Sequence, residues 1–287
     1  MLQSIRKHIK STTGRNVWIR YAFLAPWRLL YAFFSLINQT NVAGNHPESE
    51  CAHSIAVRTF NNYKLWGGIG RFHGRVAEVG PGDVGEIAEM FLADGCSQVD
   101  QIERFAYENN SSHPAVRLFR QPAEKFFLDH HGYEFIVSSV VMEHVYDPLG
   151  AIRAMARALA PGGLMIHAVD CRDHGQFSDS LHDLSFLRIP PVLYKPLTLA
   201  SGLNRVRLSD YTKALDELGL QYSILVVRLS GASADIEPPM PFELIPEELL
   251  TAARNHVAKI RPKLARKFRE MPEEDLLVAA FVLVAKS

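Results

Sequence analysis

The chain has 287 residues, 47% of them hydrophobic and 22% charged, and its 31 Lys and Arg balance its 31 Asp and Glu to a formal net charge of zero. This composition is typical of a globular protein and excludes collagen-like, coiled-coil and disordered chains. Zero net charge excludes a chain-wide basic field, so no nucleic-acid partner is expected. The three cysteines, Cys51, Cys96 and Cys171, form no CxxC pair, which predicts reduced thiols in a cytoplasmic protein.

The most hydrophobic stretch is residues 17–37, inside an N-terminal helical or lid segment that we expect to span 1–70. Arg20, Pro26 and Arg28 interrupt this stretch, and its charge-free runs are too short to cross a bilayer, so it is not a transmembrane anchor. It is predicted either to pack on the main domain as a helix or lid, or to contact a membrane surface peripherally. No apolar run with a cleavage site follows the first residues directly, so no cleaved signal peptide is expected.

From residue 75 onward, short apolar runs alternate with amphipathic helical segments. The predicted elements are strands at 75–79, 97–103, 115–119, 133–139 and 164–170, with helices at 85–95 and 149–160, the second ended by Pro161-Gly162-Gly163. This alternation predicts an α/β fold with a doubly wound, mostly parallel Rossmann-like sheet.

The remaining chain predicts an antiparallel hairpin that closes the sheet. It holds a capped helix at 209–220, a strand at 221–229, a basic helix at 251–270 and an apolar strand at 275–287. The main domain is therefore expected to span 71–287, with insertions at about 174–204 and 231–272.

The turn after the first predicted strand carries the glycines Gly80, Gly82 and Gly85 in G-x-G-x-x-G spacing, and Glu103 follows the next strand. Glycines let the backbone approach a ligand closely, and an acid at that position can accept both hydroxyl hydrogen bonds of a ribose. A dinucleotide such as NAD satisfies the same pattern and stays open as an alternative. Glu78 and Asp83 flank the loop, however, and they favour a ligand with ammonium and sulfonium charges, such as S-adenosylmethionine, over a pyrophosphate.

Several motifs together resemble one family, the class I S-adenosylmethionine-dependent methyltransferases. The resemblance covers residues 75–170 and rests on VAEVGPGDVG (76–85), Glu103, QPAE (121–124), YEFIVSSVVMEHVYDP (133–148) and ALAPGGLMIHAVD (158–170). The segments HAVDCRDHG (167–175) and LNRVRLSDY (203–211) also look like a bacterial subgroup linked to cell-envelope saccharides.

The resemblance implies S-adenosylmethionine as the cofactor and assigns its contacts along the chain. The methionine end is expected at Glu78, Gly80, Pro81 and Gly82, the ribose at Glu103, the adenine at Arg104, Ala123 and Glu124, and the sulfonium at Ser139 and Val140. The family often has Asp where this chain has Pro122, so the adenine contacts depart from the usual pattern.

Residues that follow the fourth and fifth strands are candidates for activating the methyl acceptor, because ligands bind beyond the carboxyl ends of parallel strands. His144, His174 and Asp170 are the catalytic candidates, since histidine suits a base that works near neutral pH. Candidate substrate contacts are Arg172, Asp173, Asn204 and Arg207. The group Asp173, His174, Asp179, His182 and Asp183 could gather a divalent metal, but polar loops of this kind are commonly just solvated, so no metal is expected.

These features lead us to expect a cytoplasmic methyltransferase that acts on a hydroxyl, or alternatively an amine, of a small molecule or saccharide. The alternatives are an NAD-dependent oxidoreductase or epimerase, for which the Tyr-x-x-x-Lys pair is missing after the fourth strand, and a non-catalytic cofactor-binding scaffold. A homodimer is compatible with the neutral charge and the apolar N-terminal segment.

Overall fold

The computed structural model of the chain describes residues 16–38, 52–82, 85–104, 111–177, 183–198 and 202–287. These residues form two compact units. Unit 1 takes in 16–38, 170–209 and 226–281, and unit 2 takes in 52–169, 210–225 and 282–287. Each unit is described separately below.

One seven-stranded sheet has the order β3-β2-β1-β4-β5-β7-β6, and β6 and β7 run through both units. Strands β1 to β5 pair in parallel, and the C-terminal strands are antiparallel. The predicted Rossmann-like α/β fold is confirmed. The strand bounds are β1 Gly74–Val79, β2 Cys96–Ile102, β3 Val116–Phe119, β4 Tyr133–Ser139, β5 Leu159–Asp170, β6 Gln221–Leu229 and β7 Val278–Lys286.

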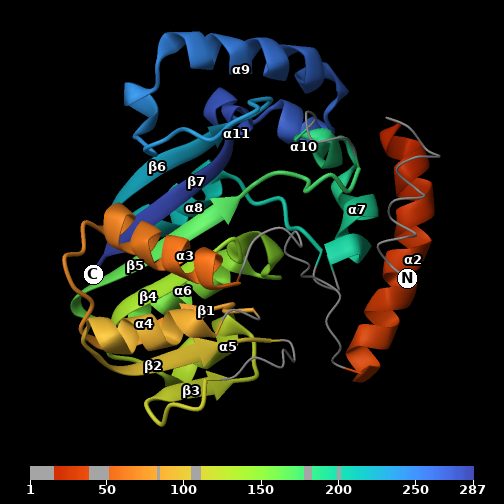
Figure 1. Ribbon diagram of the computed structural model, residues 1–287. Coiled ribbons are helices and arrows are strands. Elements are labelled where there is room, and N and C mark those ends of the chain that lie inside the picture. Colours follow the sequence, from red (N-terminus) through yellow and green to blue (C-terminus); the bar gives the residue numbers. More distant parts are fainter. Residues whose placement is uncertain (1–15, 39–51, 83–84, 105–110, 178–182, 199–201) are drawn as a thin grey trace. The chain divides into compact units, whose positions relative to one another are not determined.

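The helices of unit 2 follow from their sequences. The side chain of Asp147 caps α6 by accepting a hydrogen bond from Gly150 N–H at 2.9 Å, and Pro148 occupies the first turn, where its missing N–H costs nothing. Helices α3 and α4 pack together, as do α5 and α6, and Figure 1 shows the first pair in front of the strands. The bounds are α3 Ala52–Gly67, α4 Glu86–Asp94, α5 Ala123–Asp129, η1 Met142–His144, α6 Pro148–Ala158 and α8 Leu208–Glu217, the last starting in unit 1.

Unit 1 begins with α2, whose N-terminal N–H groups at Trp18 and Ile19 donate to the Asn16 side chain. This helix contacts η2 and η3, and the Tyr21 hydroxyl donates to the Leu193 carbonyl at 2.9 Å. The elements of unit 1 are α2 Val17–Asn38, η2 Ser185–Arg188, α7 Pro191–Tyr194, η3 Lys195–Thr198, η4 Phe242–Leu244, α9 Glu247–Ile260, η5 Arg261–Lys263, α10 Arg266–Arg269 and α11 Glu273–Leu277.

Several predicted boundaries are wrong, and three of the differences have a clear physical cause. The fifth strand begins at Leu159 rather than at 164, because the backbone passes through Pro161-Gly162-Gly163 as part of the strand. The basic helix ends at Ile260, since Pro262 cannot continue it. Residues 273–277 form α11 ahead of the last strand, where three acidic residues occupy the first helical turn and favour its positive end.

Among the described residues, no helix is long and apolar enough to cross a membrane. Cys96 and Cys171 are buried and not joined to each other by a disulfide, and Cys51 lies outside the described residues.

Candidate functional site

The predicted glycine turn of unit 2 leaves β1 with two left-handed residues. Gly80 has φ +70° and Gly82 has φ +61°, which are backbone conformations that residues with a side chain rarely adopt. A Cβ on Gly80 would lie 2.5 Å from a methyl group of Val141, while a Cβ on Gly82 would meet nothing within 4 Å. Gly80 N–H donates to the Ile102 carbonyl at 2.8 Å, which ties the turn to the end of β2. The turn is therefore fixed on one side and open on the other.

Two carboxylates meet this turn from neighbouring strands. Glu103 follows β2, is 7% exposed, and accepts a hydrogen bond from Gly82 N–H at 3.3 Å. Glu78 lies in β1 and is 2% exposed, with Oε2 accepting from the Gln101 amide at 2.8 Å. Burial raises the pKa of Glu78 to about 7, opposed by the Gln101 hydrogen bond and reinforced by the charge of Glu103. The structure thus places two of the predicted acids at one turn.

Gln101 is a site residue that the sequence prediction missed. The parallel register of β1 and β2 pairs it directly with Glu78. Only that register identifies it, because glutamine in a strand carries no sequence signal of its own.

The end of β4 carries a strained residue. Val140 has φ +57°, which is unusual for a β-branched side chain, and it is 48% exposed. Its N–H donates to the Ala168 carbonyl at 2.9 Å, while Ser139 before it is the last residue of the strand. Strain of this kind is found at ligand sites more than elsewhere. In the next turn, η1 ends at His144, which is half-buried.

The predicted adenine contacts occupy two further segments of unit 2. Ala123 and Glu124 start α5, where the backbone N–H groups of a first turn have no intrahelical acceptor. Pro122, the departure from the family pattern, takes the capping position without a side-chain hydrogen bond. Arg104 follows Glu103 and is exposed, and the next described residue is 111.

The residues of unit 2 fit the predicted cofactor. The glycine turn presents a face without a Cβ, and Glu78 and Glu103 supply negative charge with oxygen acceptors for an ammonium group and a ribose. No phosphate-binding cation is needed to complete this set, and the buried carboxylate at position 78 would disfavour a pyrophosphate.

Unit 1 holds the predicted acceptor-side residues. Asp170 ends β5, is 7% exposed, and lies between two basic side chains. The Arg172 guanidinium donates to it through Nε at 2.9 Å and Nη2 at 2.5 Å, and His174 Nε2 lies 3.3 Å from Asp170 Oδ2. Burial acts to raise the pKa of Asp170, but the hydrogen bonds and charges of His174 and Arg172 outweigh it and hold the pKa well below its usual range.

His174 is the second strained residue. Its φ is +51°, and among the described residues only His174 and Val140 are non-glycine residues with positive φ. The side chain of His174 is 26% exposed, enough to reach a ligand. Two residues that were predicted from sequence for separate roles are therefore the two non-glycine backbone outliers.

Three predicted substrate contacts have other partners in unit 1. Asp173 is buried and accepts from Gly175 N–H at 2.7 Å and Phe177 N–H at 3.2 Å, so it shapes the loop that carries His174. Asn204 is half-buried, and its Oδ1 accepts from Val206 N–H at 3.1 Å.

Arg207 is fully buried, and its guanidinium donates to the backbone carbonyls of Cys171, Asp275 and Val278 at 2.7–3.0 Å. Because these bonds occupy the guanidinium inside unit 1, the geometry favours a structural role for Arg207 over the predicted substrate contact. Arg172, whose side chain is 30% exposed, keeps a surface that a substrate could reach.

His167 lies in the core of unit 2. It is fully buried and its Nδ1 lies 2.7 Å from the Ser138 hydroxyl. Burial lowers the pKa of His167 to about 3, so it remains neutral at physiological pH.

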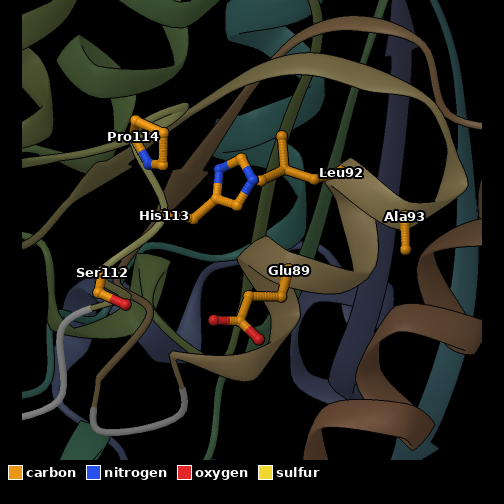
Figure 2. Close-up of a pocket in the computed structure, with 6 residues that line it drawn as sticks. All are labelled: Glu89, Leu92, Ala93, Ser112, His113 and Pro114. Carbon is orange, nitrogen blue, oxygen red and sulfur yellow. The ribbon is translucent and has the colours of Figure 1, made fainter.

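Unit 2 also has an open pocket away from the glycine turn, shown in Figure 2. Its lining comes from α4 and from the loop before β3, and consists of Glu89, Leu92, Ala93, Ser112, His113 and Pro114. Residues before β3 lie at the amino end of that strand, whereas the cofactor candidates follow carboxyl ends. Within the described residues, no group of three or more His, Cys, Asp or Glu side chains is arranged to hold a metal, and Asp179 and His182 lie outside those residues.

Comparisons with known proteins bear on the family of the chain. A family model described as a methyltransferase domain matches residues 52–223. Similar solved structures include a SAM-dependent methyltransferase from Archaeoglobus fulgidus, with 12% identity over 83% of this chain and 95% of that chain and a TM-score of 0.48. Another is from Mesorhizobium loti, with 13% identity over 83% and 98% of the two chains and a TM-score of 0.47.

A third is phosphoethanolamine N-methyltransferase 2 of Haemonchus contortus in complex with S-adenosyl-L-methionine, with 14% identity over 79% of this chain and 51% of that chain and a TM-score of 0.44. A search of curated proteins finds no significant match. The assignment rests on the family model, which covers more than half of the chain. The chain belongs to the methyltransferase-domain family and is an S-adenosylmethionine-dependent methyltransferase.

Proposed function

We propose that this enzyme methylates a hydroxyl group of a small molecule or saccharide, with His174 as the base that takes the hydroxyl proton. The single observation that carries the proposal is the pairing of His174 Nε2 with the buried Asp170 carboxylate on a backbone with φ +51°. Backbone strain costs conformational free energy, so a histidine that is held in a strained loop by a buried acid indicates a functional role.

Bound S-adenosylmethionine supplies an electrophilic methyl group. A hydroxyl oxygen that attacks a methyl group must also lose its proton, and a positioned base accelerates this step by roughly 100- to 10,000-fold. The low pKa of Asp170 keeps its carboxylate ionised, so it can accept a hydrogen bond from His174 Nε2–H. The neutral ring then has its accepting lone pair on Nδ1, the atom that we assign to the proton transfer.

Asp170 is a positioning residue in this scheme and not a second base, because its lowered pKa makes its carboxylate a weak proton acceptor. It fixes the tautomer of His174 and stabilises the imidazolium that forms. Arg172 contacts the same carboxylate, and we propose that its exposed part helps to orient the acceptor. His144 remains the competing base, since it follows β4 in the chain.

We propose that the cofactor contacts are those expected from the sequence. Gly80, Pro81 and Gly82 hold the methionine end with Glu78, and Glu103 holds the ribose. The adenine meets the start of α5 at Ala123 and Glu124 with Arg104, and the sulfonium lies against Ser139 and Val140. The turn geometry and the hydrogen bond between Gly82 and Glu103 support this assignment.

We further propose a catalytic domain of residues 71–287, with insertions at 174–204 and 231–272 and an N-terminal addition at 1–70. A cytoplasmic location and a homodimeric state remain proposals of the same kind. The insertions and the N-terminal helix fall in unit 1 together with Asp170 and His174, which supports a role in acceptor selection.

The test is a transfer assay with labelled methyl donor against panels of sugars, phenols, other alcohols and amines. We expect a hydroxyl acceptor, and we expect His174→Ala to lower kcat by roughly 100-fold or more with unchanged donor affinity. Asp170→Asn should lower kcat less, and the exposed His113→Ala serves as the matched control with wild-type kcat. Transfer to amines alone, or full activity of His174→Ala together with loss in His144→Ala, would contradict the proposal.

A further inference from the structure

One surface of unit 1 exposes large apolar side chains that the proposed chemistry does not use. They lie on α2 and α7, and are Trp18 at 44%, Ile19 at 44%, Phe23 at 57%, Leu29 at 46%, Val192 at 83% and Leu193 at 43% exposure. Single exposed apolar residues are ordinary, but a contiguous group marks an interaction surface.

The α2 members share one face of the helix. At 3.6 residues per turn, Trp18, Ile19, Phe23 and Leu29 fall within an arc of about 140°. The opposite face is buried in unit 1 through Val17 and Leu24. The exposed residues are therefore not the ones that pack α2 against the rest of unit 1.

The α7 residues extend the same surface. The Tyr21 hydroxyl on α2 donates to the Leu193 carbonyl at 2.9 Å, which holds the two helices side by side (Figure 1). Val192, next to Leu193, is the most exposed large apolar side chain among the described residues. We call the six residues on α2 and α7 the apolar face.

The positive charge of the N-terminal residues favours one kind of partner for the apolar face. The first 47 residues contain six basic residues and no Asp or Glu, although the whole chain is neutral, and the basic residues are Arg6, Lys7, Lys10, Arg15, Arg20 and Arg28. Arg20 is buried, but four of the others come directly before α2 in the chain. A second copy of this chain would bring the same positive charge and repel it, whereas an anionic lipid surface attracts it.

The combination of a basic flank, an exposed tryptophan and an apolar helix face that does not span a membrane is that of an interfacial helix. We propose that the apolar face docks this enzyme on the surface of an anionic lipid bilayer, with α2 lying in the headgroup region. This inference concerns where the enzyme works and is independent of the identity of the methyl acceptor.

The experiment is co-sedimentation of the full chain with vesicles of phosphatidylcholine, with and without phosphatidylglycerol, at low and high salt. We expect binding to the anionic vesicles only, weakened by salt. The triple variant Trp18→Ser, Phe23→Ser, Val192→Ser should bind at least about tenfold more weakly. The matched control is Leu244→Ser with Leu249→Ser, which removes two exposed apolar side chains from the same unit at 67% and 46% exposure and should bind like the wild type.

Thermal unfolding and donor binding of each variant establish that it is folded. A second variant, Lys7→Gln with Lys10→Gln and Arg15→Gln, should lose the preference for anionic vesicles. The proposal is overturned if the wild type does not bind anionic vesicles or if the triple variant binds them as well as the wild type. It is also overturned if the wild type is a dimer through the apolar face and the triple variant is a monomer.

Discussion

If the buried carboxyl group of Glu78 binds the donor as proposed, donor binding depends on pH in a calculable way. Its pKa is about 7, mainly because burial disfavours the charge. In the proposed site the ionised carboxylate faces the ammonium group of S-adenosylmethionine, so any proton on Glu78 must leave when the donor binds. Binding therefore weakens as the pH falls below this pKa.

The size of the effect follows from the fraction of Glu78 that is ionised in the free protein. That fraction falls from about one half at pH 7 to about 3% at pH 5.5, so Kd rises on the order of tenfold across this window. An α-amino group titrates near pH 8, so the ammonium of the donor stays charged throughout.

Isothermal titration with S-adenosylmethionine at several pH values measures this change. At pH 7 we also expect the release of about half a proton per site, measured by comparing buffers of different ionisation enthalpy. Glu78→Gln keeps the shape of the side chain without its charge and should bind more weakly at pH 7 with no slope between pH 5.5 and 7. The exposed Glu89→Gln is the control and should keep the slope. A flat wild-type Kd, or an unchanged slope in Glu78→Gln, would refute the reasoning.

Two further predictions concern the stability of unit 2. Gly80→Ala should destabilise the protein by about 1–3 kcal/mol more than Gly162→Ala in urea unfolding. Both positions have positive φ, but only at Gly80 does a neighbouring side chain lie 2.5 Å from the new Cβ. Equal losses of stability in the two variants would contradict this prediction. The pKa of His167 is about 3 in the folded protein and 6.5 in the unfolded chain, so the unfolded chain takes up the proton first as the pH falls. Lowering the pH from 7.5 to 5.5 should therefore reduce the free energy of unfolding by about 1.4 kcal/mol through this residue. The raised pKa of Glu78 acts in the opposite direction over this window, so the test is the difference between wild type and His167→Gln, which should lack the His167 contribution.

The sequence predicted the parallel part of the fold well because strong local signals marked it. The fourth strand, Tyr133–Ser139, was predicted at its observed bounds, since its centre is the apolar run Phe135-Ile136-Val137 between polar segments. The start of β7 was missed because Leu276 and Leu277 of α11 continue the apolar run, and nothing in the composition separates helix from strand there.

The candidate site could be predicted only where a residue type reveals its role. Glycines and acids at the first turn did so, and Glu103 lies at that turn in the structure. The buried partners of Arg207 could not be predicted, because a charged residue usually indicates surface. The strain at Val140 and His174 was equally hidden, since tertiary packing and not local sequence imposes it.

The central claim is that the donor lies at the glycine turn, with its ribose held by Glu103. The most direct measurement is titration of S-adenosylmethionine into wild type, Glu103→Ala and the surface control Glu89→Ala. We predict one donor per wild-type and control chain, and Kd weaker by about 100-fold in Glu103→Ala, because two charge-assisted hydrogen bonds to the ribose are lost. Equal affinity in all three proteins, with Glu103→Ala still folded, would contradict the claim.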